Sequence, residues 1–256
     1  MRLRNQVVVI TGASSGFGEL IARRCVAQGA RVVLAARSAP ALERLADELG
    51  RALALPVPAD VTSDADVRRL VQQTVERFGQ ADVLVNNAGF GVMDRFEQAR
   101  LDDLQEMMEV NVYGAVRCTQ AFLPLMRARR SGQIVMMASL AGLIATYAMD
   151  FYCATKFALV GMTRNLMVEL HGSGVRCALI CPGVAMTNFM RRADITKFPL
   201  ITRITSTTAE QVADATLHAI ARRTHGEVLV PWFMRPVVAV ANLNPNLSQH
   251  VIRLVG

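Results

Sequence analysis

A glycine-rich turn near the start of the chain constrains the fold more than any other sequence feature. The apolar run VVVIT leads into GASSGFG, and the amphipathic run ELIARRCVAQGA follows. Glycines at Gly12, Gly16 and Gly18 permit a tight turn with close backbone approach, and the N–H groups at a helix start attract a pyrophosphate. The strand before the turn and the helix after it favour a dinucleotide site, although a βα turn without a ligand stays open on this motif alone.

Short apolar runs alternate with amphipathic ones along most of the remaining chain. The strand-like runs are RVVLAA, ALPVPAD, DVLVNN, QIVMMAS, VRCALICPG and GEVLV. Continuous apolar strands that alternate with helices are typical of parallel sheets buried on both faces. The pattern predicts an α/β fold: a Rossmann-type, doubly wound parallel sheet of about seven strands with helices on both faces, in three αβα layers. No repeat or low-complexity linker interrupts it, so we expect one domain over residues 1–256.

The end of the second strand bears on the choice of dinucleotide. An Asp or Glu usually stands there and binds the adenosine ribose hydroxyls. Here Ala35 and Ala36 occupy that place, and Arg37 follows. No carboxylate repels a 2′-phosphate, and a guanidinium can bind one with two hydrogen bonds. We therefore expect NADP(H) to be favoured over NAD(H), the alternative being that Arg37 only lies in solvent and specificity is loose.

A second set of chemically suggestive residues lies between 139 and 156. Tyr152 and Lys156 are four apart in a helix-like segment, a spacing that places two side chains on one helix face. A lysine ammonium beside a tyrosine favours phenolate, so we expect Lys156 to lower the Tyr152 pKa and to make Tyr152 a general acid/base. Ser139 ends an apolar run just before a glycine-containing loop, where its hydroxyl can face a ligand.

Together these motifs resemble the short-chain dehydrogenase/reductase family, in its compact single-domain form. The resemblance is spread over about 180 residues. It rests on seven motifs in the family's order: T-G-x-x-x-G-x-G from Thr11 to Gly18, Asp60-Val61, N-N-A-G from Asn86 to Gly89, Asn111, Ser139, Y-x-x-x-K from Tyr152 to Lys156, and Pro182-Gly183 with Thr187.

The resemblance implies an enzyme that interconverts a ketone or aldehyde and a secondary alcohol by hydride transfer with NAD(P). Tyr152 would exchange the proton, Ser139 would orient the substrate oxygen, and Lys156 would hold the nicotinamide ribose. Asn111, at a helix interruption, would support a water next to Lys156, or would mend the bend as a buried amide. The implied cofactor-binding set is Gly12, Ser14, Ser15, Gly16, Phe17, Gly18, Arg37, Asp60, Val61, Asn87, Ala88, Gly89, Tyr152, Lys156, Pro182, Gly183 and Thr187.

Composition excludes several other functions. The net charge of +7 permits anion binding, but the basic residues are scattered and no long basic run with aromatics occurs, so we expect no nucleic-acid partner. Five cysteines without a secretory signal indicate a reducing compartment, and we expect a cytoplasmic protein. In a strand, Cys177 and Cys181 would lie about 13 Å apart, too far for one zinc, so no metal is expected.

The substrate is not determined by the sequence. An expected lid from 188 to about 208 is largely apolar, as are Phe90, Val92, Met93, Met149 and Phe151, which favours a lipophilic substrate. The apolar C-terminal segment fits a subunit or core role better than membrane contact. Helices around 101–130 and 152–171 resemble those that pair subunits in the family, implying a homodimer or homotetramer. A non-catalytic NADPH-binding regulator and an epimerase- or dehydratase-type relative remain alternatives, the latter disfavoured because no separate substrate domain is present.

Overall fold

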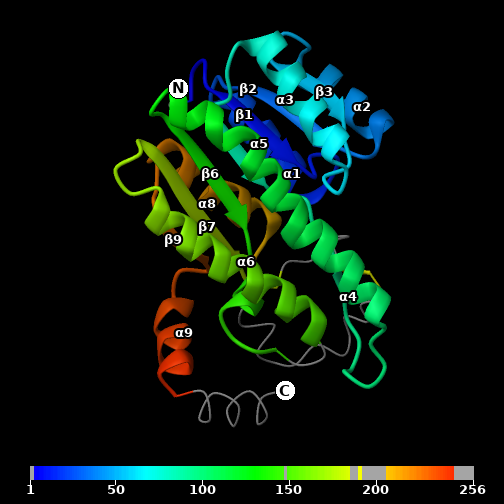
Figure 1. Ribbon diagram of the computed structural model, residues 1–256, viewed down its shortest axis with the longest axis vertical. Helices are drawn as coiled ribbons and strands as arrows, with labels where there is room; N and C mark the ends of the chain where they lie inside the picture. Colours follow the sequence, from blue (N-terminus) through cyan, green and yellow to red (C-terminus); the bar gives the residue numbers. More distant parts are fainter. Residues whose placement is uncertain (1–2, 147–148, 185–189, 192–205, 245–256) are drawn as a thin grey trace.

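Seven parallel strands form a continuous central sheet, as the sequence predicts (Figure 1). The computed structural model describes residues 3–146, 149–184, 190–191 and 206–244. The strand order is β3-β2-β1-β4-β6-β7-β9, so the order reverses between β1 and β4. A reversal of this kind opens a crevice at the carboxyl ends of the strands. The strands are β1 Val7–Thr11, β2 Arg31–Ala36, β3 Ala54–Pro58, β4 Val83–Asn86, β6 Gly132–Met137, β7 Val175–Pro182 and β9 Gly226–Val230.

Helices cover both faces of this sheet, which gives the expected three layers (Figure 1). Side chains alternate along each strand, so Val7 and Val9 join one apolar layer while Val8 and Ile10 join the other. Helices α3, α5 and α6 pack on the first layer, and α1, α2 and α8 pack on the second. These helices are α1 Gly16–Ala27, α2 Ala39–Leu49, α3 Asp64–Phe78, α5 Gly114–Ala128, α6 Asp150–Glu169 and α8 Ala209–Ala221.

The helix interruption predicted near Asn111 is confirmed. Helix α4 (Leu101–Met108) continues through a π-helical segment, Glu109–Tyr113, into α5. Such single-turn π segments are frequent at functional sites. Here the extra residue per turn places Asn111 inward, where its side chain is buried.

Some elements were not predicted from the sequence. Two residues of β5 (Gly91–Val92) pair in parallel with two of β8 (Met190–Arg191), which ties the loop after β4 to the segment after β7. Helix α8 begins with a capping box at Thr208 and Gln211, and α9 spans Met234–Leu243. Most of the expected lid, and Thr187 with it, lies outside the described residues. All five cysteines are buried and free, and none of the described helices is long and apolar enough to cross a membrane.

Candidate active site

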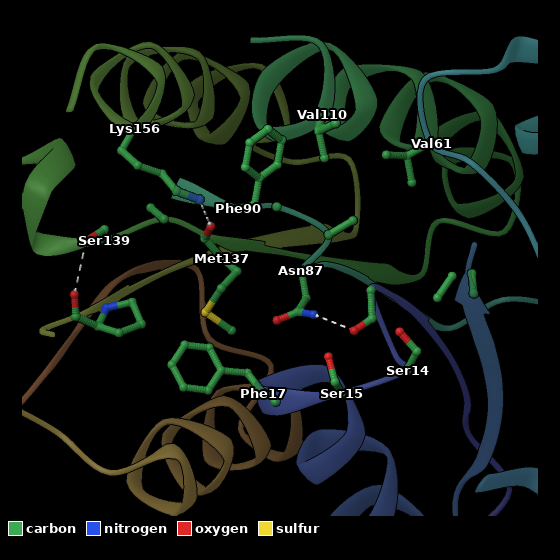
Figure 2. Close-up of a pocket in the computed structure, with 18 of the residues that line it drawn as sticks. Ser14, Ser15, Phe17, Val61, Asn87, Phe90, Val110, Met137, Ser139 and Lys156 are labelled. Atoms are coloured by element: carbon green, nitrogen blue, oxygen red, sulfur yellow. Dashed lines mark hydrogen bonds between the residues drawn. The ribbon is translucent and has the colours of Figure 1, made fainter. Parts of the chain in front are cut away.

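A cleft of about 720 Å³ runs along the carboxyl ends of the sheet (Figure 2). Of the residues predicted from the sequence, it is lined by Gly12, Ser14, Ser15, Gly16, Phe17, Arg37, Asp60, Val61, Asn87, Ala88, Gly89, Ser139, Tyr152, Lys156, Pro182 and Gly183. Gly18 and Asn111 do not line it. The cleft thus brings together two groups that are more than a hundred positions apart in the chain.

The glycine turn between β1 and α1 forms one wall of the cleft. Gly12 has φ +66°, and a β-carbon added there would lie 2.9 Å from the Ala88 Cα atom. A β-carbon at Gly18 would collide with the Gly12 carbonyl oxygen, so Gly18 serves close packing beneath the turn. Gly16, at φ +59°, faces open space in the cleft, where a side chain would occupy the approach to the start of α1. This arrangement fits a pyrophosphate at a helix N-terminus.

Thr11 and Asn87 hold the two sides of this wall together. The Thr11 hydroxyl accepts hydrogen bonds from the N–H groups of Asn87 and Ala88, both at 3.0 Å, and donates to the Val85 carbonyl at 3.3 Å. The Asn87 amide donates to the Thr11 carbonyl at 2.9 Å. Asn87 therefore acts as a support between strands, and Thr11, which the predicted site set omits, has an equal part in it. The available signal was the place of Thr11 at the end of an apolar strand and at the start of the T-G-x-x-x-G-x-G motif.

The far end of the cleft holds one arginine and one aspartate. Arg37 follows β2, is exposed, and makes no ion pair within the part of the chain that the structure describes. Asp60 lines the same end, with its carboxylate accepting from the Thr62 N–H at 2.9 Å and from the Thr62 hydroxyl at 2.8 Å. Val61 lies against Gly114 of α5, where a β-carbon would come within 2.6 Å of a Val61 methyl group.

The other end of the cleft contains Ser139, Tyr152 and Lys156. Ser139 precedes the 3-10 helix Leu140–Gly142, and its hydroxyl donates to the Pro182 carbonyl at 3.4 Å and accepts from the Ala141 N–H at 3.1 Å. Tyr152 and Lys156 share one face of α6, with the lysine Nζ 5.6 Å from the centre of the tyrosine ring. Lys156 Nζ donates to the Met137 carbonyl at 2.9 Å (Figure 2).

Burial dominates the protonation of this pair. Burial raises the pKa of Tyr152 well above its usual value of 10, while a hydrogen bond with Ser139 acts in the opposite direction. Burial lowers the pKa of Lys156 from 10.5 to about 8. Burial therefore sets the net direction of the Tyr152 pKa, because Lys156 directs its ammonium at the Met137 carbonyl, and the expected lowering of the Tyr152 pKa by Lys156 stays a prediction.

Asn111 lies behind the cleft and braces two of its walls. Its amide oxygen accepts from the Phe90 N–H, and its nitrogen donates to the Phe90 carbonyl, both at 2.9 Å. The same nitrogen donates to the Thr155 hydroxyl at 3.2 Å, which in turn donates to the Tyr152 carbonyl at 2.8 Å. Asn111 thus ties the loop after β4 to the helix that carries Tyr152. Sequence reasoning did not include Thr155 in the site.

The cleft is apolar around Tyr152. Phe90, Met149 and Val110 line it there, and Phe90 and Met149 belong to a small buried cluster with Tyr152. Val92, Met93 and Phe151, which the sequence also placed near the catalytic residues, pack in or against this cluster.

The family model for short chain dehydrogenases matches residues 6–197. The chain belongs to the short-chain dehydrogenase family. A meso-2,3-butanediol dehydrogenase of Serratia marcescens is 38% identical over 188 residues, covering 73% of this chain and 74% of the relative. An uncharacterized oxidoreductase of Staphylococcus aureus is 33% identical over 229 residues, covering 88% of this chain and 95% of the relative.

Solved structures of family members share the fold. A short-chain dehydrogenase/reductase from Burkholderia phymatum in complex with NAD has a TM-score of 0.84 at 30% identity, covering 96% of each chain. A 3-ketoacyl-(acyl-carrier-protein) reductase from Brucella melitensis complexed with NADH has a TM-score of 0.81 at 29% identity, covering 89% of this chain and 97% of the other. This short-chain dehydrogenase is thus an oxidoreductase acting on CH–OH groups, with a nicotinamide dinucleotide as its cofactor.

Proposed function

We propose that this short-chain dehydrogenase is an NADP(H)-dependent oxidoreductase that interconverts a lipophilic ketone or aldehyde and a secondary alcohol, with Tyr152 as the general acid/base. The observation that carries the proposal is the arrangement of one cleft. One end holds Arg37 beyond the glycine turn, and the other holds Ser139 and Tyr152 among apolar side chains. A dinucleotide bound along this cleft would have its two ends at these two places.

The preference for NADP(H) rests on this chain's own residues. Arg37 is exposed at the cleft, and Ala35 and Ala36 leave the end of β2 without a carboxylate. A guanidinium that binds a 2′-phosphate contributes charge-assisted hydrogen bonds, which are about twice as strong as neutral ones. The two solved relatives hold NAD and NADH, so the preference proposed here is a property of Arg37 and its surroundings.

The proposed proton transfer follows from the burial of Tyr152. A phenol with a raised pKa stays protonated at neutral pH, so Tyr152 is ready to donate a proton to a carbonyl oxygen. When bound, the nicotinamide supplies or accepts the hydride. Ser139 lies beside Tyr152 and would hold the same oxygen by a hydrogen bond. The protonation state thus favours carbonyl reduction at neutral pH, and alcohol oxidation requires loss of that proton.

Lys156 and Asn111 have supporting roles in this proposal. With a pKa of about 8, Lys156 is mainly charged at neutral pH and offers donors to ribose hydroxyls at the cleft. Asn111 holds Phe90 and, through Thr155, the turn of α6 that carries Tyr152. Asn111 would also contact a water near Lys156, and this water would form part of the proton path.

The apolar lining around Tyr152 supports a lipophilic substrate, with Phe90, Val110 and Met149 on the cleft wall. A homodimer or homotetramer is also part of the proposal. Exposed apolar side chains on α6 support it, because Phe157, Met162 and Val168 are 46%, 43% and 75% exposed and offer apolar contacts to a second copy.

Replacing Tyr152 with Phe tests the catalytic part of the proposal. The variant retains the aromatic ring and loses the exchangeable proton, so carbonyl-dependent oxidation of NADPH should fall by about 100-fold or more. NADPH binding, measured by fluorescence titration, should stay within about twofold of wild type, because the hydroxyl makes only a small part of the contact surface. Tyr113→Phe is the matched control, since Tyr113 is 45% exposed on the π-helical segment. Turnover by Tyr152→Phe equal to wild type, with the cofactor bound, would support the non-catalytic regulator instead.

A further inference from the structure

Helix α9 presents an apolar surface to solvent. Trp232 and Phe233, just before the helix, are 76% and 45% exposed, and Leu243 at its end is 85% exposed. Val237 and Val240 between them are also exposed, whereas Met234 and Val238 are buried. We call Trp232, Phe233, Val237, Val240 and Leu243 the α9 surface. Isolated exposed apolar side chains are ordinary, but a contiguous set on one element indicates a binding surface.

Within the described residues, α9 buries only two of its side chains. Its buried residues, Met234 and Val238, join the apolar layer next to Leu229 of β9. Figure 1 shows α9 standing off the body of the molecule, beside the edge of the sheet. A helix with apolar residues over most of its circumference is normally buried in a protein core or in a membrane.

The α9 surface lies at the same edge of the sheet as the cleft. All seven strands are parallel, so β9 ends where the catalytic residues lie, and α9 begins four residues later. The Gly183 N–H, at the cleft wall, donates to the Val230 carbonyl at 2.7 Å, which joins the cleft directly to the chain entering α9. In Figure 1 α9 occupies the same end of the long axis as the loop between β6 and α6.

The charge of α9 favours an anionic membrane over a second copy of the chain as the partner of this surface. From Val228 to Asn244 the described chain contains no Asp or Glu and has one basic residue, Arg235, and the whole chain carries a net charge of +7. Arg235 is exposed on α9. An exposed tryptophan and phenylalanine beside an exposed arginine, on a helix without carboxylates, match the surface of an anionic bilayer. A second copy of the chain already has apolar side chains available on α6, and it would bring an equal positive charge to α9.

We propose that the α9 surface docks the protein onto an anionic membrane, so that the cleft receives its lipophilic substrate at the bilayer surface. The proposal that the protein docks on a membrane is argued from the α9 surface alone. Only the delivery of a lipophilic substrate to the cleft rests on the function proposed above.

Flotation of the full-length protein with lipid vesicles tests the docking. Vesicles of phosphatidylcholine alone are compared with vesicles that also contain phosphatidylserine, at low and high salt. Wild type should float with the anionic vesicles, and less at high salt, because screening weakens the attraction of a basic surface. Leu243→Ser and Trp232→Ser should each lower the vesicle partition coefficient by about tenfold, the effect expected for one large apolar side chain. Val75→Ser on α3 is the matched control, since Val75 is an exposed apolar residue outside both α6 and α9, and it should bind as wild type does.

Three further results separate the alternatives. Reduction of a water-soluble ketone should be unchanged in Leu243→Ser, so a loss of vesicle binding is distinguished from a failure of the catalytic proposal. No flotation of wild type, or equal flotation of all variants, would overturn the docking. Dissociation of an oligomer by Leu243→Ser, measured by light scattering and without any vesicle binding by wild type, would also overturn it and would assign the α9 surface to a second copy.

Discussion

Replacing Lys156 with Met should stabilise the nucleotide-free protein at neutral pH, although it removes a proposed functional residue. Lys156 is 3% exposed, and burial lowers its pKa from 10.5 to about 8. At about 1.4 kcal/mol per pKa unit, the folded state at neutral pH carries a cost of about 3 kcal/mol for keeping this charge buried. Loss of the hydrogen bond to the Met137 carbonyl offsets about 1 kcal/mol of the gain. A net gain of about 2 kcal/mol is expected.

The pH dependence gives the sharper result. Between the folded pKa of about 8 and the unfolded pKa of 10.5, the unfolded chain binds more protons than the folded one. Wild-type stability from this group therefore rises with pH across that window, whereas the Met variant has no such contribution. The difference between the two proteins should change by about 3 kcal/mol from neutral pH to about pH 10.5, whatever the hydrogen bond contributes. A buried thiol with a raised pKa, such as Cys177, opposes folding at high pH, but it does so in both proteins.

Urea unfolding of both proteins at the two pH values, without nucleotide, measures this difference. Arg37→Met is the control, since Arg37 is exposed and its replacement should shift stability little at either pH. A Lys156→Met protein that is destabilised by the same amount at both pH values would refute the reasoning, because it would mean that the buried ammonium stabilises the fold.

Two further predictions concern the walls of the cleft. Thr11→Val removes the acceptor for the N–H groups of Asn87 and Ala88, so it should lower the unfolding free energy by about 1–3 kcal/mol in urea titrations, whereas Thr11→Ser should restore most of it. Gly114→Ala should push Val61 towards the cleft and weaken NADPH binding several-fold in a fluorescence titration. Adding Val61→Ala should restore binding, because it removes the methyl groups that the new β-carbon displaces. An unchanged dissociation constant in Gly114→Ala would contradict the packing argument.

Much of the fold was predictable because local patterns coincide with global packing. The apolar strands are buried on both faces, so their continuous runs identify them, and the glycine turn indicates where the first helix begins. The pairing of β5 with β8 was not predictable, because two residues carry no period. The exposure of α9 was not predictable either: an apolar run such as PVVAVANL predicts burial, and only the structure indicates that Val237, Val240 and Leu243 of this helix are exposed.

The sequence predicted which residues form the site, but it did not predict their pKa values or their hydrogen bonds. The spacing of Tyr152 and Lys156 correctly placed both on one helix face. Their pKa values depend on burial and on where the ammonium is directed, and neither follows from spacing. Asn111 was assigned to the helix interruption, but its two hydrogen bonds with Phe90 depend on a loop that arrives from another part of the sheet.

Binding of NADPH and NADH, measured by fluorescence titration on wild type and on Arg37→Asp, tests the central claim most directly. The account predicts tighter binding of NADPH by wild type, by about 10-fold or more, because a charge-assisted contact with a phosphate is worth about 1.5–3 kcal/mol. In Arg37→Asp the preference should reverse, since the new carboxylate repels a 2′-phosphate and can bind ribose hydroxyls. Equal binding of both cofactors, unchanged by the substitution, would contradict the account and leave Arg37 as a solvated side chain beside the cleft.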